Sequence, residues 1–304
     1  MQLIRIMRPS HWIKNVFVFA ALIFGKKLFG PADETLLAVG STVAAFFCFC
    51  LAASAIYIFN DMVDREADSI HPERRSRPIA AGRVSIVSAV LLSSLLAVGS
   101  TACSFIVTGK LGIIILIYIV LMILYSLLLK RVMILDCVTI SVGFCLRAVA
   151  GAVVVAVDVS PWLIICTFAL CLFLAFSKRR GEVAQLQENS EAFRKTLSGY
   201  TPELLAHMLD VTSVLAVVCF LLYSMDDRTF ATFGTNNLVY TTPLVLYCVF
   251  RFSALTQKGV YSDPVKLIFR DWPFQLGFVL WVILCVAIIY GNKLGISLSN
   301  IWAD

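Results

Sequence analysis

The feature that most constrains this chain is its series of long apolar stretches, each close to the length that crosses a bilayer. A membrane-spanning helix needs about 20 mostly apolar residues, and a helix satisfies its backbone hydrogen bonds without help from water or lipid. The approximate ranges of the nine predicted helices are 15–31, 37–59, 84–107, 111–129, 133–156, 160–177, 205–223, 238–255 and 274–291. We therefore expect an all-α, polytopic membrane protein that forms one transmembrane domain over residues 1–304.

The composition agrees with this interpretation. Hydrophobic residues make up 60% of the chain, charged residues make up 14%, and the mean hydropathy is +0.90. Soluble domains carry about 25% charged residues, so a soluble enzyme, a disordered chain and a fibrous repeat are excluded. The 10 cysteines lie within or beside apolar stretches and form no CxxC pair, which is typical of small buried side chains. The 3 histidines have no metal-ligand spacing, and no zinc site is expected.

The basic residues are divided unequally between the two sides of the predicted topology. Of the 25 Lys and Arg, 19 fall on the side that holds the N-terminus, 5 fall on the opposite side, and Arg147 lies inside a span. Because cytoplasmic loops collect Lys and Arg, the sequence predicts a cytoplasmic N-terminus and a location in the cytoplasmic (inner) membrane. Basic residues confined to one membrane face also argue against a nucleic-acid partner.

Three connections between the predicted spans are long or polar. The two long ones, 60–83 and 178–204, fall on the cytoplasmic side and mix charged with apolar residues. We expect them to fold over the membrane as cap loops. The polar stretch near 224–237 falls on the opposite side, and we expect it to be a solvated external loop.

Acidic residues are concentrated where the second predicted span ends, in the segment NDMVDREADSIHPERRSRPIAAG at 60–82. If the helix continues past the membrane edge, Asp61, Asp64 and Asp68 fall at i, i+3 and i+7, on one face. Asn60 is four residues before Asp64 and lies on that face too. Oxygen ligands of this kind suit Mg²⁺, which proteins bind with one or two carboxylates together with substrate phosphates.

A basic run follows the acids in the same segment, at Arg74, Arg75 and Arg77. Guanidinium groups bind phosphate bidentately, so acids that bind a metal beside several arginines predict a site for a polyanionic substrate. The spacing alone is also consistent with an alternative interpretation, in which the segment is a solvated helix end and its acids pair with these arginines.

These motifs together resemble the UbiA-type intramembrane prenyltransferases. Within that superfamily the chain is most similar to the bacterial decaprenyl-phosphate phosphoribosyltransferases. The resemblance rests on NDxxDxxxD and HPERRSRPIAAG in the acidic segment, and on further stretches along nearly the whole chain. These stretches are RPSHWIKN at 8–15, LAASAIYIFND at 51–61, YSLLLKRVMILD at 125–136, LRAVAGAV at 146–153, SKRRGEV at 177–183 and FRKTLSGYT at 193–201.

The resemblance implies a nine-helix fold around a central cavity and transfer of 5-phosphoribose from phosphoribosyl pyrophosphate to a polyprenyl phosphate. It also implies that Asn60, Asp64 and Asp68 hold Mg²⁺ and the pyrophosphate, with Asp61 nearby. We expect Asp64, Asp68 and Lys14 to be catalytic. The acceptor phosphate is already anionic, so no general base is needed, and attack on the face opposite the leaving pyrophosphate predicts inversion at the anomeric carbon.

One departure from the superfamily pattern bears on the substrate. UbiA-type prenyltransferases of the usual kind carry a second aspartate-rich motif after the sixth span, but the corresponding stretch here opens with Lys178, Arg179 and Arg180 and has no aspartate. A basic stretch suits a second phosphate-bearing substrate and favours phosphoribosyl transfer. The alternative function is transfer of a polyprenyl chain to an aromatic acceptor. The alternative interpretation of the basic run is a positive-inside helix end.

The remaining candidates for substrate binding are spread over the other motifs. They are Arg74, Arg75, Arg77, Tyr125, Lys130, Asp136, Arg147, Lys178, Arg179, Glu182 and Tyr200. An arginine inside a span is a functional candidate because it is costly there, although a structural salt bridge from Arg147 to Asp136 is an alternative. Lys14, Tyr125 and Lys130 are equally typical of interfacial anchors. The sequence leaves a homo-oligomer open. A transporter is disfavoured, because transporters bind near the membrane midplane and these acids gather at its edge.

Overall fold

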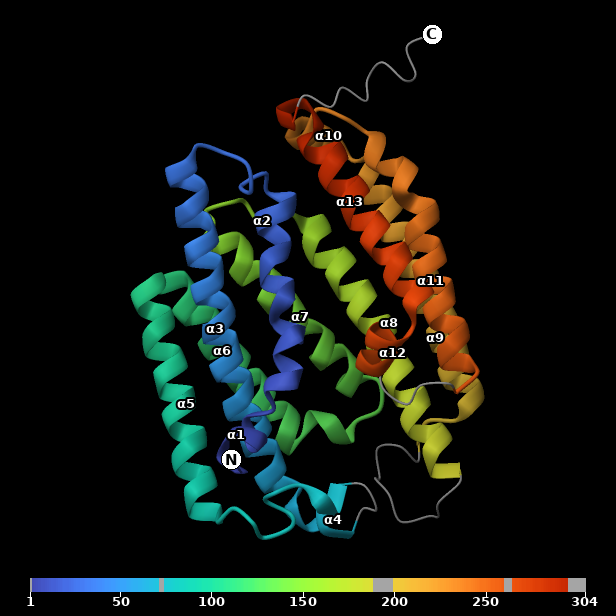
Figure 1. The fold of residues 1–304 in the computed structure, drawn as a ribbon. Coiled ribbons are helices and arrows are strands. Elements are labelled where there is room, and N and C mark those ends of the chain that lie inside the picture. The colour runs from blue at the N-terminus through green and yellow to red at the C-terminus, as the bar shows by residue number, and fades with distance from the viewer. Residues whose placement is uncertain (1, 71–73, 188–198, 260–263, 295–304) are drawn as a thin grey trace. The chain divides into compact units, whose positions relative to one another are not determined.

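The computed structural model describes residues 2–70, 74–187, 199–259 and 264–294, and every regular element in these ranges is a helix (Figure 1). Eight helical segments in the described chain are long and apolar enough to cross a membrane. They are α3 (Ala32–Val63), α5 (Ile86–Val107), α6 (Gly109–Leu127), α7 (Leu135–Val154), α8 (Pro161–Gln187), α9 (Pro202–Met225), η5 (Asn237–Thr241) with α11 (Thr242–Gln257), and α13 (Trp272–Leu294). The prediction of an all-α, polytopic membrane protein is confirmed.

Shorter helices connect or flank these segments. They are α1 (Gln2–Met7), η1 (Pro9–Phe19), α2 (Ala20–Phe24), α4 (Arg65–Ile70), η2 (Arg74–Ser76), η3 (Leu129–Arg131), α10 (Asp227–Phe233) and α12 (Pro264–Arg270). Several of them lie directly before or after a long helix, and the candidate site described below is built at such junctions.

The first predicted span differs most from its expected form. Instead of an α-helix over 15–31, the chain forms the 3₁₀ helix η1 over 11 residues and then α2 over 5 residues. A 3₁₀ helix rises about 2.0 Å per residue, against 1.5 Å in an α-helix. The two segments together therefore extend about 30 Å, close to the thickness of the hydrocarbon core. A ninth span stays a prediction, with Pro9–Phe24 as its apolar candidate.

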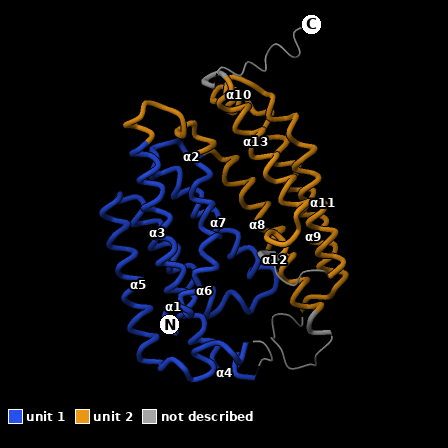
Figure 2. Tube along the Cα trace, viewed as in Figure 1, with its two compact units in different colours: residues 1–22, 36–159 blue, residues 23–35, 160–304 orange. Residues whose placement is uncertain are grey.

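The chain divides into two compact units (Figure 2). Unit 1 contains Met1–Leu22 and Leu36–Val159, and unit 2 contains Ile23–Thr35 and Ser160–Asp304. In unit 1, residues of η1, α3, α6 and α7 form one apolar core. Phe49 of α3 and Tyr118 of α6 pack edge to face in that core, with ring centroids 5.4 Å apart. A second cluster joins α1, the end of α3 and the start of α5 through Ile6, Ile58 and Ala89.

The contact between η1 and α7 is very close, and a glycine makes it so. A side-chain Cβ atom at Gly151 would overlap the backbone carbonyl of Val18. Because Val18 is fully buried at this contact, the absence of a side chain at residue 151 lets the two backbones approach each other.

Unit 2 packs α8 against α9, and α11 against α9 and α13. Phe173, Leu209 and Phe252 are buried together in one of its apolar clusters. At the start of α13, Asp271 accepts hydrogen bonds from the Phe274 backbone N–H (2.8 Å) and from Arg251 Nε and Nη2 (2.6 and 2.9 Å). The Arg251 hydrogen bonds lower the pKa of the Asp271 carboxyl. This ion pair therefore stabilises the fold at neutral pH and is lost only as the pH falls through that lowered pKa.

The expected external loop contains a helix. The stretch near 224–237 holds α10, which Asp226 caps by accepting from the Arg228 N–H (3.1 Å) and which ends at Gly234 with φ 74°. Its Phe233 is buried beside Tyr290, but most residues of the stretch are exposed, so only the expectation of a loop differs from the structure. Asp and Gly are cap residues of helices as well as loop residues, which explains why the helix was not predicted.

The two expected cap loops are only partly irregular. The segment 60–83 contains the end of α3, then α4 and η2, and residues 71–73 lie outside the described chain. In the segment 178–204, α8 continues to Gln187, and residues 188–198 lie outside the described chain. The single domain over 1–304 and the covering of the membrane by these segments stay predictions.

Candidate functional site

The acidic motif lies on a nearly continuous helical path from α3 into α4. Asn60 and Asp61 belong to the last turn of α3, Asp64 lies at the junction, and Asp68 belongs to α4. The Asp64 N–H donates to the Asn60 carbonyl (2.9 Å), and the Asp68 N–H donates to the Asp64 carbonyl (2.8 Å). The helical hydrogen-bond pattern thus crosses the junction, as the expected continuation of the helix requires.

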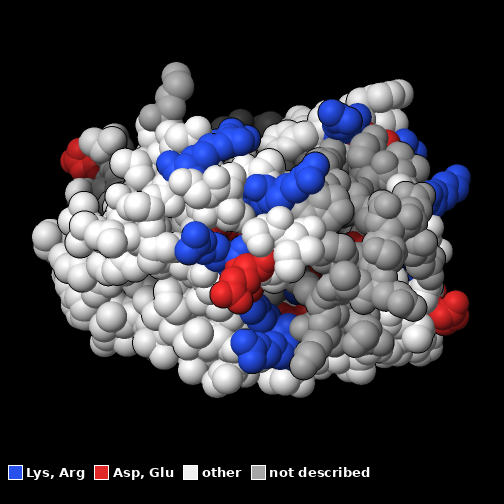
Figure 3. All heavy atoms as spheres, turned by 90° about the horizontal axis from the view of Figure 1, so that it is seen from below, with Lys and Arg blue, Asp and Glu red and all other residues white. Residues whose placement is uncertain are grey.

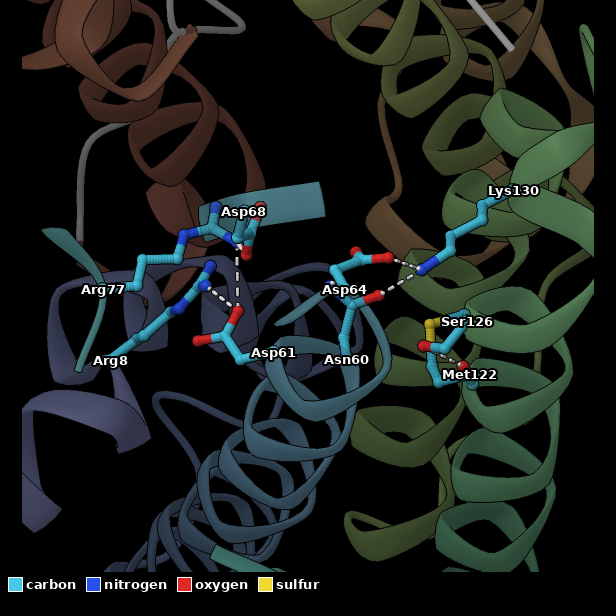
Figure 4. Close-up of polar contacts among 9 residues, drawn as sticks. All are labelled: Arg8, Asn60, Asp61, Asp64, Asp68, Arg77, Met122, Ser126 and Lys130. Carbon is cyan, nitrogen blue, oxygen red and sulfur yellow. Dashed lines mark hydrogen bonds and ion pairs between the residues drawn. The ribbon is translucent and has the colours of Figure 1, made fainter. Parts of the chain in front are cut away.

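Arg77 links the two buried carboxylates of the motif. Asp61 and Asp68 are only 3% and 2% exposed. Arg77 Nη1 donates to Asp61 Oδ1 (3.1 Å) and to Asp68 Oδ2 (2.5 Å), and Arg8 Nη2 also donates to Asp61 Oδ1 (Figure 4). Burial of a carboxylate is costly unless it is paired and hydrogen-bonded. The two arginines supply that pairing.

Lys130 lies against the other half of the motif. It comes from η3, directly after α6, and its Nζ donates to Asp64 Oδ1 (2.6 Å) and Asn60 Oδ1 (3.2 Å) (Figure 4). Asn60 Nδ2 in turn donates to Asp64 Oδ2 (3.0 Å). Two oxygens from neighbouring turns of one helix therefore converge on a single cation.

Arg8 is a site residue that sequence reasoning missed. It has φ 52° and ψ 60°, a left-handed conformation that is strained for arginine and that clusters at functional sites. Its guanidinium also lies over the Tyr57 ring, 5.3 Å from the centroid. The sequence feature that could have drawn attention to Arg8 is its position before Pro9, because a residue before proline is restricted in conformation. Its partner Asp61 is 53 residues away, and nothing local in the sequence indicates that pairing.

The side-chain oxygen atoms of Asn60 and the motif's aspartates are of the chemical kind that binds a divalent cation. Carboxylate and amide oxygens are the ligands that Mg²⁺ takes, and Asn60 and Asp64 already direct one oxygen each at the same ammonium group. In the described ranges, no group of three or more His, Cys, Asp and Glu side chains is gathered as a metal site. Asp68 is directed at Arg77 instead. The assignment of Asn60, Asp64 and Asp68 to Mg²⁺ stays a prediction.

Arg147 is buried within unit 1 and is held by neutral groups. Its Nε donates to Asn15 Oδ1 (2.7 Å), its Nη1 to the Gly143 carbonyl (2.6 Å) and its Nη2 to the Tyr118 hydroxyl (2.9 Å). The rings of Phe49, Tyr118 and Phe144 surround it at 4.7–5.5 Å. The alternative of a salt bridge to Asp136 is wrong, because Asp136 lies about 16 Å earlier along the same helix.

The other candidates of unit 1 lie around these contacts. Lys14 is half-buried in η1, beside the buried Asn15. Tyr125 is half-buried near the end of α6, and Asp136 is completely buried in the first turn of α7. In η2, Arg74 is half-buried and Arg75 is exposed. Their roles in substrate binding stay predictions.

The candidates of unit 2 are close to one another along the last turns of α8. Arg179 is buried and donates to Glu182 Oε2 (2.5 Å). Lys178 is half-buried, and Tyr200 is buried just before α9 begins. Arg180 Nη1 donates to the Pro202 carbonyl (2.9 Å). The basic run is therefore helical and partly engaged inside unit 2.

Charged side chains are exposed on the face that α4 reaches. The space-filling view of that face shows Lys and Arg together with a few Asp and Glu, on a surface that is otherwise largely uncharged (Figure 3). Arg75 of η2 and Glu66 of α4 are among the exposed residues of this segment.

Comparison with known proteins identifies the family. The sequence profile described as the UbiA prenyltransferase family matches residues 16–270. This chain belongs to the UbiA prenyltransferase family. Among curated UbiA relatives, the decaprenyl-phosphate phosphoribosyltransferase of Mycolicibacterium smegmatis is 33% identical over 300 residues, covering 95% of this chain and 92% of that protein. The protein of that name from Corynebacterium glutamicum is 31% identical over 291 residues, covering 95% of this chain and 86% of that protein.

A solved structure shares the fold of this chain. A UbiA homologue from Archaeoglobus fulgidus, solved with DMAPP and Mg²⁺ bound, superimposes with a TM-score of 0.69 at 16% sequence identity. The match covers 95% of this chain and 99% of that one. At this identity the likeness shows the fold, and it agrees with the multi-pass membrane architecture of the UbiA family.

Proposed function

We propose that this UbiA-family protein transfers 5-phosphoribose from phosphoribosyl pyrophosphate to a polyprenyl phosphate of the decaprenyl type, with release of pyrophosphate. Relatives named decaprenyl-phosphate phosphoribosyltransferase match 95% of the chain and support the substrates. The structural observation that carries the proposal is the mixed cluster of unit 1. It combines an oxygen pair from Asn60 and Asp64 with cations from Arg77 and Lys130, as a site for a metal-bound pyrophosphate requires.

The residues of the cluster divide into two roles. Asn60, Asp64 and Asp68 would hold Mg²⁺, and a bound Mg²⁺ would offset negative charge on the departing pyrophosphate. Phosphate oxygens are bound by Arg77, Lys130 and Arg8. The basic surface continues with Arg74 and Arg75. Lys14 lies in the adjoining η1 segment, and we assign it to phosphate binding as well.

The reaction itself asks for positioning and charge stabilisation. A phosphate oxygen of the lipid forms a bond to C1 of the ribose while the bond from C1 to the pyrophosphate oxygen breaks, and the electron pair leaves with pyrophosphate. The attacking phosphate is already anionic, so no proton has to be removed from it. Cationic side chains around the leaving group stabilise the transition state. Attack on the opposite face inverts the anomeric carbon, and recovery of a product with retained configuration would contradict this step.

The end of α8 favours phosphoribosyl transfer over the alternative. Of the glutamates in this stretch, Glu182 is paired with Arg179, and Glu188 and Glu191 lie outside the described residues. The stretch contains no aspartate, whereas a prenyl diphosphate would call for a second aspartate-rich motif here. Arg179 and Lys178 instead suit a phosphate-bearing substrate.

A second candidate function is transfer of a polyprenyl chain from its diphosphate to an aromatic acceptor. It is favoured by the name of the family and by the A. fulgidus homologue solved with DMAPP and Mg²⁺. The two functions differ in what they consume. Purified protein given a prenyl diphosphate and an aromatic acid would form a prenylated aromatic compound only if this second candidate is correct.

A direct transfer assay tests the first candidate. Purified protein in detergent is mixed with Mg²⁺, labelled phosphoribosyl pyrophosphate and polyprenyl phosphate, and we expect the label to move into the organic phase. Asp64→Asn removes a proposed metal ligand and should lower that transfer at least about tenfold, which corresponds to about 1.4 kcal/mol of transition-state stabilisation. Glu66→Gln changes an exposed acid on the same segment and should leave the transfer close to wild type. An active Asp64→Asn protein would remove the metal assignment.

A further inference from the structure

Lys130 occupies the place that the proposed function gives to a metal ion. Its ammonium group lies 2.6 Å from Asp64 Oδ1 and 3.2 Å from Asn60 Oδ1, which are two of the oxygens assigned to Mg²⁺. The contact is shielded from water, since the side chains of Lys130 and Asp64 are only 14% and 16% exposed. An ion pair so placed is stronger than a surface pair, because solvent screens it less.

A divalent ion and the Lys130 ammonium compete for these oxygens. The two cations would repel each other at the short separation that both sets of contacts impose. Metal binding by Asn60 and Asp64 therefore favours the release of Lys130 from them. A long, flexible lysine side chain with three rotatable donors can make that move, provided that another anion receives it nearby.

The pyrophosphate of the donor is the anion that would receive Lys130. Under the proposed function, that group lies against the metal and carries several phosphate oxygens. Lys130 can then exchange a carboxylate for a phosphate and remain paired throughout. Binding of the metal without the donor costs Lys130 its contact with the Asp64 carboxylate. Binding of the donor without the metal leaves Asp64 and the phosphate oxygens competing for the Lys130 ammonium.

We propose that Lys130 is the exchangeable counter-ion that couples metal binding to donor binding at this site. The inference rests on the proposed function and deepens it. Pyrophosphate draws Lys130 away from the metal-binding oxygens, and the metal displaces Lys130 towards pyrophosphate. The affinity of the site for the metal therefore rises when pyrophosphate is present. By reciprocity, the affinity for pyrophosphate rises by the same factor when the metal is present.

The other half of the cluster has the same arrangement. Arg77 Nη1 bridges Asp61 and Asp68, so it too is a cation held between carboxylates. Asp68, the third proposed metal ligand, is released only when Arg77 turns to another anion. Lys130 is the sharper test of the two, because loss of Arg77 would disturb two buried acids at once: Asp68 would lose this cation, and Asp61 would keep only its contact with Arg8 of the two arginines.

Metal binding measured without turnover tests the proposal. Mn²⁺ takes oxygen ligands as Mg²⁺ does, and its binding to the full-length protein is followed by the loss of the free-ion signal in electron paramagnetic resonance. Without pyrophosphate, Lys130→Met should bind Mn²⁺ at least about fivefold more tightly than wild type, the lower limit of common coupling factors. Inorganic pyrophosphate also binds Mn²⁺ in solution, so the bound fraction is corrected by the same titration without protein. After that correction, pyrophosphate should raise the Mn²⁺ affinity of wild type by a larger factor than that of the variant.

A neighbouring residue provides the matched control. Arg131→Met removes the same charge from the next residue, which is exposed, and should leave the Mn²⁺ affinity within about twofold of wild type because solvent screens that charge. Lys130→Gln keeps a polar side chain without the charge and should behave as Lys130→Met. It serves in place of Lys130→Met if that protein does not purify as a folded, monodisperse species.

The outcomes separate this inference from the proposed function. A Lys130 residue that only binds phosphate would leave the Mn²⁺ affinity without pyrophosphate unchanged or lowered in both Lys130 variants, and either result overturns the proposal. If that happens while wild type still moves labelled phosphoribose to the lipid, the proposed function stands without the coupling. If the variants gain affinity but no label moves, the coupling stands and the choice of substrate is wrong.

Discussion

At the scale of single residues, Arg147 shows how a charge is kept inside an apolar unit without a carboxylate. Its three polar partners are two neutral side chains and a carbonyl, and aromatic rings surround it. Asn15, one of those partners, is buried in η1 next to Lys14. The planar guanidinium thus ties η1 to α6 and α7, and it positions the segment that carries a proposed phosphate-binding residue.

Arg147→Lys tests that role of the guanidinium fork. The variant keeps the charge, but an ammonium group cannot reach three partners that the planar fork reaches at once. Buried polar groups left without partners cost about 1–3 kcal/mol, so the melting temperature of the purified protein should fall. Arg131→Lys changes an exposed arginine at the end of η3, before α7 begins, and should melt as wild type does. Equal melting temperatures for Arg147→Lys and wild type would contradict the structural role.

The site residues differ in how far the sequence predicts them. The spacing of Asp61, Asp64 and Asp68 is local, so helical periodicity predicted their placement along one path. Their partners are not local, because Arg8 is 53 residues from Asp61 and Lys130 is 66 residues from Asp64. Lys130 was found only by resemblance and Arg8 was missed, since no sequence pattern shows which distant cation meets which acid.

At the scale of elements, the contact between η1 and α7 depends on one missing side chain. Gly151→Ala would place a Cβ atom on the Val18 carbonyl, and backbone on both sides would have to move. We expect a clear fall in melting temperature, because overpacking costs about 1–3 kcal/mol. Gly99→Ala is the matched control: it also lies within a long apolar helix, with nothing within 4 Å of its added Cβ. It should be neutral or stabilising, since alanine favours helix by up to about 1 kcal/mol.

Most helices were predictable because apolar stretches of this length have one stable form in lipid. The ranges expected for α5, α6 and α7 differ from the observed ones by no more than two residues at any end. The end of α8 was misplaced, since charged residues continue a helix as readily as they end it. The 3₁₀ form of η1 was not predictable either, because the hydrophobic pattern does not show that Asn15 and Gly151 hold that segment against α7.

At the scale of the whole molecule, the distribution of Lys and Arg predicts which residues share a compartment. Five membrane-crossing helices separate Glu66 from Asp227. A membrane-impermeant maleimide should therefore label Asp227→Cys in intact cells, and Glu66→Cys only after the cells are opened, each measured against wild type. Labelling of Glu66→Cys in intact cells would reverse the proposed cytoplasmic orientation.

The same experiment decides the number of spans. If Pro9–Phe24 crosses the membrane, Leu3→Cys lies in the same compartment as Glu66→Cys, because two crossings separate them. If that segment does not cross, Leu3→Cys is labelled together with Asp227→Cys. Leu3 is 48% exposed in α1, so the introduced thiol is accessible to the reagent.

The pairing of three acids with three bases also bears on how the protein is made. Arg8 leaves the ribosome before any of the acids, Arg77 follows soon after them, and Lys130 arrives two helices later. The newly synthesised chain therefore contains the cations that neutralise these acids. This end of unit 1 can fold at the membrane without a bound metal ion. A chelator should then abolish the transfer activity while the protein stays folded, unlike in domains that need a bound metal to fold.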